Sequence, residues 1–422
     1  AGLSAAITLA QGGWAVDLLE ARDRVGGRCA SATLAGVAVD LGAEFSHGRT
    51  AVVGVCEEAG IPVEAAYSWD PEAPPSMQVA FAAGGRLLGA HDPAVKSHHA
   101  FLEAIVEDES WDDPGAVDRP MEALAEGLDD RARALVDASQ AVEYATSMAD
   151  LGASEWRRRE TFFAAHDCST DFTLGGAYGR AMAHLAARAR ALGVRVSLGK
   201  AARKVVADRA GGVVVDGYAF DACVVTAPLA ALQRGDLTVA PLAPAFEAAV
   251  RGVRMHGASK VVISAVAAQS ASEEDPAAWA ATLPRMVVSA DGFARQLWLR
   301  EAAGRVLVTA FLAGPRDAAV AEALSCDEAA DRLAEQISAL AGRRVAWVDA
   351  VKVDWGRDPF AQGAYSSPSV GMCGAWRDLF DTGLPHLRYA GEAAHERGST
   401  VDSALEAGEA AARAILANSG RQ

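Results

Sequence analysis

AGLSAAITLAQGGWAVDLLEARDRVGGR, residues 1–28, has the features of a helix, a turn, a strand and a glycine turn in that order. Small apolar residues follow Gly2 and predict a helix that packs closely on a sheet. Residues 14–20 form a short apolar run that closes on Glu20, which is typical of a buried parallel strand. An acid at the tip of the second strand of a dinucleotide-binding unit accepts hydrogen bonds from a ribose, so Glu20 is a candidate for that contact.

The usual dinucleotide fingerprint is G-x-G-x-x-G, and Gly2 is the only one of its glycines in the sequence. The strand and the two glycines that normally come before it are not in the sequence. We therefore expect the native protein to carry roughly ten more residues upstream, about one strand and a turn.

Composition and charge restrict the possible partners. The 422 residues are enough for two domains, and 51% hydrophobic with 22% charged residues is ordinary for a soluble globular protein. No apolar run is long enough to cross a bilayer. The net charge of −16 argues against nucleic acid and anionic membranes as partners and suits cationic substrates.

The six cysteines are scattered and include no C-x-x-C pair. They predict reduced core residues in a cytoplasmic protein, with no disulfide framework and no metal site. A homodimer is compatible with this composition.

The order of elements predicts an α/β protein with two domains, each assembled from separated parts. A Rossmann-type nucleotide domain is expected from residues 1–60, 172–250 and 351–422. An α+β substrate domain with a mixed sheet and helices is expected from residues 61–171 and 251–350. Within the latter, Met121–Tyr144 has acids and arginines spaced for a solvent face and predicts one helical stretch.

Four separated stretches resemble motifs of the flavin-dependent (FAD) amine oxidases, of the monoamine and polyamine oxidase type. EARDRVGGR at 20–28 resembles the family's LEAR-x-R-x-GGR segment, and WGRDPFAQGAYS at 355–366 resembles its W-G-x-D-P-x-x-x-G-x-Y-S loop. YAGE at 389–392, followed by Gly398–Gly408, resembles the final FAD motif. Lys260 in ASKVV matches the family lysine that faces the flavin.

The resemblance implies FAD as the cofactor. It assigns the Gly26–Arg28 turn to the pyrophosphate, the backbone near Ala202 to the adenine, and Glu392 to the ribityl or pyrophosphate part. The N–H of Val401, at the start of a helix, is assigned to the isoalloxazine ring. Ala364 stands where covalently flavinylated members have cysteine, so we predict non-covalent FAD. The full predicted cofactor set is Gly2, Glu20, Ala21, Arg22, Gly26, Gly27, Arg28, Gly42, Ala43, Glu44, Ala202, Gly391, Glu392, Thr400 and Val401.

Lys260 and Tyr365 are the first predicted catalytic residues. In the family the lysine holds a water against flavin N5, where its charge favours reaction of the reduced flavin with oxygen. The tyrosine is one wall of an aromatic cage for the amine. Thr400 stands where monoamine oxidases have the second tyrosine, which leaves room for a longer or bulkier amine. A strand-end lysine and a packing tyrosine are the alternatives.

Residues 42–48, GAEFSHG, supply further candidates. Glycines that flank a polar cluster indicate backbone held close to a ligand. The run resembles the G-A-x-W-I-H-G segment of animal polyamine oxidases, with Phe45 and Ser46 in place of Trp and Ile. The resemblance implies that Phe45 and His47 face the substrate. We predict a neutral, catalytic His47 that either accepts a hydrogen bond from the substrate ammonium or helps to keep the amine unprotonated near neutral pH. A structural histidine is the alternative. Glu44 either binds a distal cation of the substrate or holds the loop.

The resemblance implies an oxidase of primary or secondary amines, and the acidic balance and His47 favour polyamine-type substrates. A hydride equivalent passes from the carbon next to nitrogen to flavin N5, the imine hydrolyses, and oxygen is reduced to hydrogen peroxide. The alternatives are an oxidase of aromatic, heterocyclic or L-amino acid amines, a flavin desaturase, and a non-catalytic FAD-binding partner protein.

Overall fold

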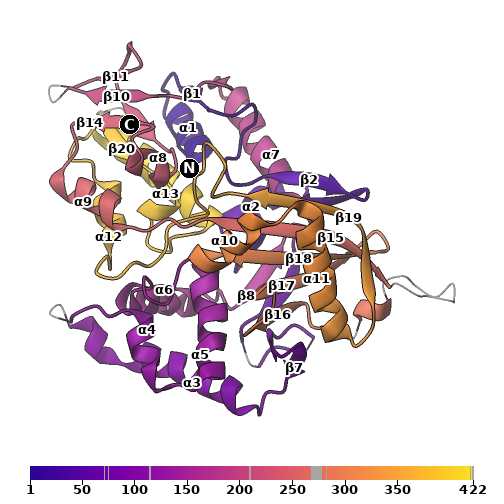
Figure 1. Cartoon of the computed structure of the whole chain (residues 1–422). Coiled ribbons are helices and arrows are strands. Elements are labelled where there is room, and N and C mark those ends of the chain that lie inside the picture. The colour runs from indigo at the N-terminus through magenta and orange to yellow at the C-terminus, as the bar shows by residue number, and fades with distance from the viewer. Residues whose placement is uncertain are drawn as a thin grey trace.

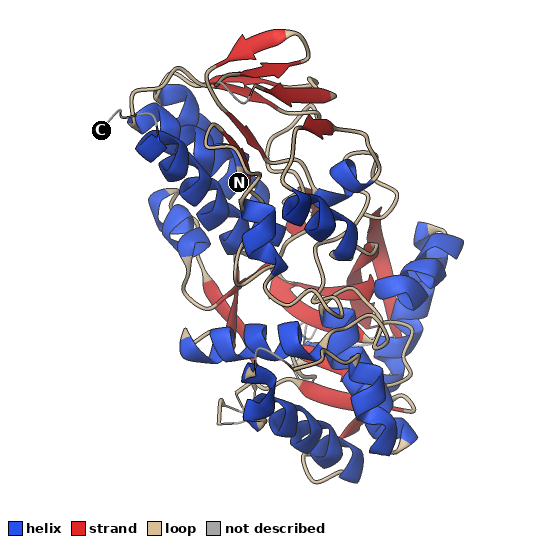
Figure 2. Cartoon of the chain, turned by 90° about the vertical axis from the view of Figure 1, so that its left-hand side faces the viewer, coloured by secondary structure: helices blue, strands red, loops and turns tan. Residues whose placement is uncertain are grey.

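The computed structural model describes residues 1–70, 72–74, 76–113, 116–208, 211–267, 278–281, 283–418 and 420. Two layers of structure meet across its middle (Figures 1 and 2). One contains long helices with several small sheets, and the other contains one broad sheet with helices on both faces. None of the described helices has the length and apolar character needed to span a membrane.

The first layer is built around the N-terminal helix α1 (Gly2–Gln11). This helix packs against α13 (Val401–Asn418) and α7 (Tyr178–Ala191), so the two ends of the chain are neighbours. The predicted strand at 14–20 is shorter than expected, since only Asp17–Leu19 (β1) pairs with a neighbour. The remaining helices of this layer are α2 (Ala51–Glu58), α8 (Leu229–Gln233), α9 (Pro244–Gly252) and α12 (Ala375–Phe380).

Small sheets accompany these helices. Strand β1 pairs in parallel with β9 (Arg195–Ser197), and β13 (Cys223–Val225) pairs in parallel with β20 (Leu387–Tyr389). A four-stranded sheet has the order β12-β11-β10-β14. Its strands are β10 (Lys204–Ala207), β11 (Val213–Val215), β12 (Tyr218–Phe220) and β14 (Thr238–Ala240). A hairpin of β2 (Ser31–Leu34) and β3 (Val37–Asp40) belongs to none of these sheets.

The second layer is a mixed seven-stranded sheet in the order β19-β15-β18-β17-β16-β6-β7. Strand β15 (Ala258–Ala267) lies between β18 (Arg305–Ala313) and β19 (Val345–Asp354), and eight of its ten residues are buried. The other strands are β17 (Gln296–Ala302), β16 (Met286–Ser289), β6 (Ala80–Ala83) and β7 (Arg86–Leu88).

Alternate side chains of this sheet face opposite sides, as the pleat requires. Leu297 packs with α10 (Gly314–Ala323) and α11 (Cys326–Ala341) on one face. Its neighbour Trp298 packs with the helical segment of residues 93–141 on the other face. That segment contains α3 (Pro93–Glu107), α4 (Met121–Leu124), α5 (Asp130–Val136) and the wide helical turn η3 (Asp137–Ala141). The single helix predicted over 121–144 is therefore broken.

The three-stranded sheet β4-β8-β5 and helix α6 (Ala153–Ala165) complete the molecule. Strand β4 (Phe45–His47) pairs with β8 (Thr170–Thr173), which also pairs with β5 (Glu64–Ser68). The six cysteines are all free, as predicted, although Cys373 is exposed rather than in the core. No cluster of three metal-ligating side chains occurs within the described ranges.

Candidate active site

A cavity of about 1380 Å³ lies between the two layers and exceeds the usual size of a small-molecule pocket. Every side chain or backbone segment singled out from the sequence lines this one cavity. These residues are Gly2, Glu20, Ala21, Arg22, Gly26, Gly27, Arg28, Gly42, Ala43, Glu44, Phe45, His47, Ala202, Lys260, Tyr365, Gly391, Glu392, Thr400 and Val401.

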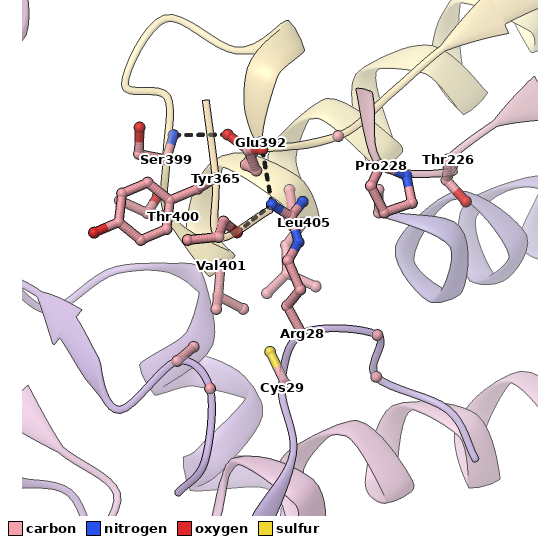
Figure 3. A pocket seen from close by; sticks show the side chains of 18 of the residues that line it. Arg28, Cys29, Thr226, Pro228, Tyr365, Glu392, Ser399, Thr400, Val401 and Leu405 are labelled. Carbon is pink, nitrogen blue, oxygen red and sulfur yellow. Dashed lines mark hydrogen bonds and ion pairs between the residues drawn. The ribbon is translucent and has the colours of Figure 1, made fainter. Parts of the chain in front are cut away.

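The carboxylate of Glu392, only 5% exposed, joins three segments at the cavity wall, and Figure 3 shows its contacts with Arg28 and Ser399. It accepts hydrogen bonds from the Ser366 hydroxyl at 2.6 Å, from the Ser399 N–H at 3.2 Å and from Arg28 Nη1 at 3.1 Å. Arg28 Nη1 also donates to the carbonyl of Ala364 at 2.5 Å. Glu392 therefore shapes the cavity by holding other residues in place.

Glycines allow the backbone to come together at the same wall. Gly26 and Gly27 have φ of +98° and +57°, which favour glycine. A Cβ on Gly42 would stand 1.7 Å from the carbonyl oxygen of Arg28. A side chain at this position would therefore collide with the backbone of Arg28. The expectation that residues 42–48 hold backbone close to a ligand remains a prediction.

The Glu20 carboxyl follows β1 and accepts a hydrogen bond from the backbone N–H of Arg22 at 2.9 Å. Burial raises the pKa of Glu20. The Arg22 guanidinium makes a bidentate pair with Asp358, at 2.7 and 2.5 Å, and lies over the rings of Trp355 and Phe360. Arg22 therefore fastens the 355–360 loop to the first segment at the cavity wall.

Lys260 enters the cavity from β15 and is 5% exposed. Its Nζ donates to the carbonyl of Gly42 and to Glu44 Oε2, both at 2.7 Å, and lies 5.0 Å from the centroid of the Trp298 ring. Trp298 Nε1 donates to Glu44 Oε1 at 2.9 Å. Of the two roles considered for Glu44, the structure has it holding the loop through Lys260. An ammonium has three donors, so one N–H of Lys260 remains for a ligand.

Aromatic side chains form the part of the cavity next to this pair. The Phe45 ring meets Tyr67 and Trp298 edge-on, with centroids 5.0 and 5.2 Å apart. The Tyr365 hydroxyl donates to the carbonyl of Glu143 at 2.5 Å. Thr400 uses its hydroxyl to cap α13 by accepting from the Ser403 N–H at 3.0 Å. Sequence reasoning missed Tyr67 and Trp298, because aromatic residues in strands give no signal that separates a cavity wall from a core.

His47 faces Asp171 across the β4–β8 pairing, with Nδ1 2.5 Å from Oδ1. Burial alone lowers the pKa of His47, but the Asp171 carboxylate outweighs it and raises the pKa to about 9. The imidazole is therefore charged at neutral pH. The prediction of a neutral His47 was wrong in charge state, because the partner that fixes it lies 124 residues away. A protonated ring has no free acceptor for an ammonium.

Two further carboxyl groups line the cavity and were not predicted. Burial raises the pKa of Glu143 to about 7, although His47 lowers it in part. Burial also raises the pKa of Glu160, which accepts a hydrogen bond from the Tyr144 hydroxyl at 2.9 Å. Within the described part of the chain, no lysine or arginine forms an ion pair with either group. Nothing in the local sequence distinguishes them from surface acids.

Comparison with known proteins gives one family. Residues 1–416 match the model of the flavin-containing amine oxidoreductases. The chain is 24% identical over 448 residues to polyamine oxidase 4 of Oryza sativa subsp. japonica, covering 97% of this chain and 85% of that protein. Wild-type putrescine oxidase bound to putrescine has a TM-score of 0.78 at 18% identity, covering 98% of this chain and 96% of the other. Cyclohexylamine oxidase from Brevibacterium oxydans IH-35A has a TM-score of 0.79 at 17% identity, covering 99% and 96%. The predicted fold class is confirmed.

The Lys260–Glu44 pair generates a stability prediction. Lys260→Met leaves the Glu44 carboxylate buried without its cation, which should lower the free energy of unfolding by roughly 3–5 kcal/mol in urea titrations. The double variant Lys260→Met/Glu44→Gln should lose less than the sum of the single variants. Arg195→Gln, which breaks a pair whose arginine side chain is 72% exposed, is the control and should cost less than about 1 kcal/mol. Additive single effects would contradict the coupling.

The His47–Asp171 pair generates a pH prediction. The folded pKa of about 9 lies above the ordinary value of 6.5, so the pair stabilises the fold fully below pH 6.5 and loses this contribution as the pH rises through 9. In Asp171→Asn the largest influence that raises the pKa of His47 is lost, while burial still lowers it and Glu143 and Asp402 raise it only in part, so the pKa should fall well below 9. NMR titration of the ring protons measures both values. Asp167→Asn, at an exposed neighbouring acid, should leave the titration unchanged. A midpoint near 9 in the Asp171 variant would show that Asp171 is not the cause.

Proposed function

This chain belongs to the flavin-containing amine oxidoreductases, and from that premise we propose that it is an FAD-dependent oxidase of primary or secondary amines with a preference for polyamine-type substrates. The observation that carries the preference is the surplus of negative charge in the cavity. Glu143 and Glu160 are buried there without an ion-pair partner among the described residues. Buried carboxylates of this kind are stabilised by a cation, and a di- or polyamine has a second ammonium to offer.

The cavity wall fits a bound flavin dinucleotide. Glu20 would hold a ribose, and the Gly26–Arg28 turn, whose backbone can only be glycine at two positions, would hold the pyrophosphate. The first N–H groups of α13, at Val401, would face the ring system. The residue at 364 is a buried alanine with no group that could bond to the flavin, which supports non-covalent binding.

When bound, FAD supplies the hydride acceptor and the reaction with oxygen. The chain's own residues bind and orient the amine. Tyr365, fixed by its hydrogen bond to the carbonyl of Glu143, and Phe45 form apolar walls that exclude water and can face an ammonium. Lys260 has its charge balanced by Glu44 and keeps one N–H with which to hold a water. His47 neutralises Asp171 and does not act as a base.

A second candidate substrate class is supported by the aromatic side chains. Phe45, Tyr67 and Trp298 form a cluster on one side of the cavity that suits a cyclic or aromatic amine. The domain division predicted from the sequence and a homodimer remain predictions. We further propose a cytoplasmic protein that takes small-molecule amines and oxygen, which the six free cysteines support.

A panel of amines tests the proposal. The flavin-loaded protein should release hydrogen peroxide with di- and polyamines at higher kcat/KM than with alkyl monoamines, cyclic amines or L-amino acids. Acid precipitation should leave the flavin in the supernatant. The highest kcat/KM with a cyclic amine would favour the second class. Bound flavin with no peroxide from any amine would favour the non-catalytic alternative.

The carboxyl surplus gives a residue-level prediction. Glu143→Gln and Glu160→Gln each remove a charge-assisted hydrogen bond worth roughly 1.5–3 kcal/mol, and should raise KM for a diamine about tenfold or more. The KM of a monoamine of equal chain length should change much less. Glu122→Gln, at an exposed acid on α4, is the control. Equal losses for both amines would show that the carboxyls support the fold and do not bind the second ammonium.

A further inference from the structure

Helix α5 does not continue regularly into the cavity wall. It passes into η3, Asp137–Ala141, a π-helical turn that holds one residue more than an α-helical turn. Such a turn shifts the phase of every residue that follows it and leaves backbone carbonyls poorly aligned with their usual donors. It persists only where surrounding groups satisfy those carbonyls. The surroundings of η3 therefore explain why the turn is wide here.

Gln296, the first residue of β17, supplies two of these partners. Its side chain is 2% exposed, and Nε2 donates to the carbonyl of Ala138 at 3.0 Å and to the carbonyl of Ser139 at 3.1 Å. The same amide lies close enough to the carboxyl of Glu143 to lower its pKa in part. One amide thus contacts both the wide turn and the cavity carboxyl that follows it.

Other elements hold the side chains of the same turn. Arg295, next to Gln296, pairs with Asp137 at the start of the turn and with Asp317 of α10. Two more contacts come from helices α3 and α6: His98 Nε2 lies 2.7 Å from the Ser139 hydroxyl, and Trp156 Nε1 donates to Gln140 Oε1 at 2.9 Å. The turn is fixed by the sheet and by both helices.

The wide turn changes the direction in which the next residues of the helix point, and Glu143 is the residue where this matters. Its carbonyl accepts the Tyr365 hydroxyl at 2.5 Å, and its carboxyl lines the cavity. The groups that face this carboxyl are His47 of β4, Asp171 of β8 and Glu160 of α6. The cation-binding carboxyl and the aromatic wall therefore depend on one residue, whose placement depends on the wide turn.

We propose that Gln296 is a positioning residue: its amide holds the π-helical turn Asp137–Ala141 so that Glu143 presents its carboxyl to a substrate ammonium and its carbonyl to Tyr365. The inference rests on the proposed function for the identity of the ligand. It adds that Gln296, on the sheet, sets the specificity for a second ammonium. Gln296 does so by positioning Glu143, which contacts the ammonium, and does not touch the substrate itself.

Gln296→Leu tests the proposal, because leucine keeps the approximate volume and removes all three contacts. The matched control is Gln233→Leu, since Gln233 Nε2 donates to two backbone carbonyls, those of Val250 and Val253, outside the cavity. Calorimetry without oxygen, on proteins loaded with reduced flavin that cannot accept a hydride, measures the binding of putrescine and of butylamine from pH 6 to 9 without turnover. Hydrogen exchange of the peptide over 137–143 measures the turn itself.

Gln296→Leu should weaken putrescine binding about tenfold, leave butylamine binding nearly unchanged, and speed exchange over 137–143. The pH above which putrescine binds tightly should rise, since the Glu143 carboxylate loses a donor. In a Glu143→Gln background the substitution should have little further effect on putrescine. Gln296→Asn, which reaches fewer of these groups, should be intermediate and takes over the test if the leucine variant does not fold.

A Gln296 variant that matches Gln233→Leu in putrescine affinity, pH dependence and exchange overturns this inference but leaves the proposed function standing. Equal weakening of putrescine and butylamine also overturns it, because a general structural role would produce that result. A parent protein that binds putrescine with the expected pH dependence but oxidises no amine leaves the positioning role supported and overturns the proposed function. A parent protein that neither binds nor oxidises putrescine overturns both.

Discussion

The hydrogen-bonded carboxylate of Glu392 is the interaction on which the nucleotide end of the cavity depends. Its donors come from Arg28 near the start of the chain, from Ser366 and from Ser399. None of these segments belongs to a regular helix or strand that would fix it otherwise. A buried carboxylate is stable only where donors surround it, and buried donors need an acceptor, so the three loops and Glu392 require one another. The flavin motifs converge because of this mutual requirement.

Charges around the rest of the cavity are arranged in the same way. Four cations of the predicted motifs are each matched to a carboxylate within hydrogen-bond distance. The pairs are Arg22–Asp358, Arg28–Glu392, Lys260–Glu44 and His47–Asp171. Glu143 and Glu160 differ from these carboxylates, because neither forms an ion pair with a lysine or arginine among the described residues. A cavity that binds amines needs this surplus, and focusing by apolar walls increases its effect.

Features that depend on residues close together in the chain could be predicted from the sequence. Gly42 was singled out as a place of close backbone approach, and a Cβ there would stand 1.7 Å from the carbonyl oxygen of Arg28, so the neighbour that only glycine permits is the chain's own backbone. The flavin-binding motifs are short runs whose spacing survives in any context, so the fold class and the set of cavity residues could be recognised.

Properties that depend on distant partners could not be predicted. The charge of His47 is set by Asp171, which becomes its neighbour only through the β4–β8 pairing. The predicted 121–144 helix breaks at the 3-10 turn Ala125–Gly127 and starts again after Asp129, whose side chain caps α5. The wide turn η3 further along accepts two hydrogen bonds from Gln296, and no periodicity within those residues reports a side chain more than 150 positions away. The strand expected over 14–20 is short because pairing with β9 covers only Asp17–Leu19.

The two unmatched carboxyls raise the question of how a folded protein tolerates them. Desolvation would make a fixed charge costly, and the raised pKa of Glu143, about 7, shows how the cost is limited. The raised pKa means that burial favours the neutral carboxyl, which needs no counter-ion. In the function proposed here, an arriving ammonium favours the carboxylate, lowers its pKa and releases a proton. The substrate therefore stabilises the negative charge that binds it, while Lys260 and His47 already have carboxylate partners in the protein. Selectivity for a second ammonium and tolerance of the ligand-free cavity follow from the same physical property, burial without a resident partner.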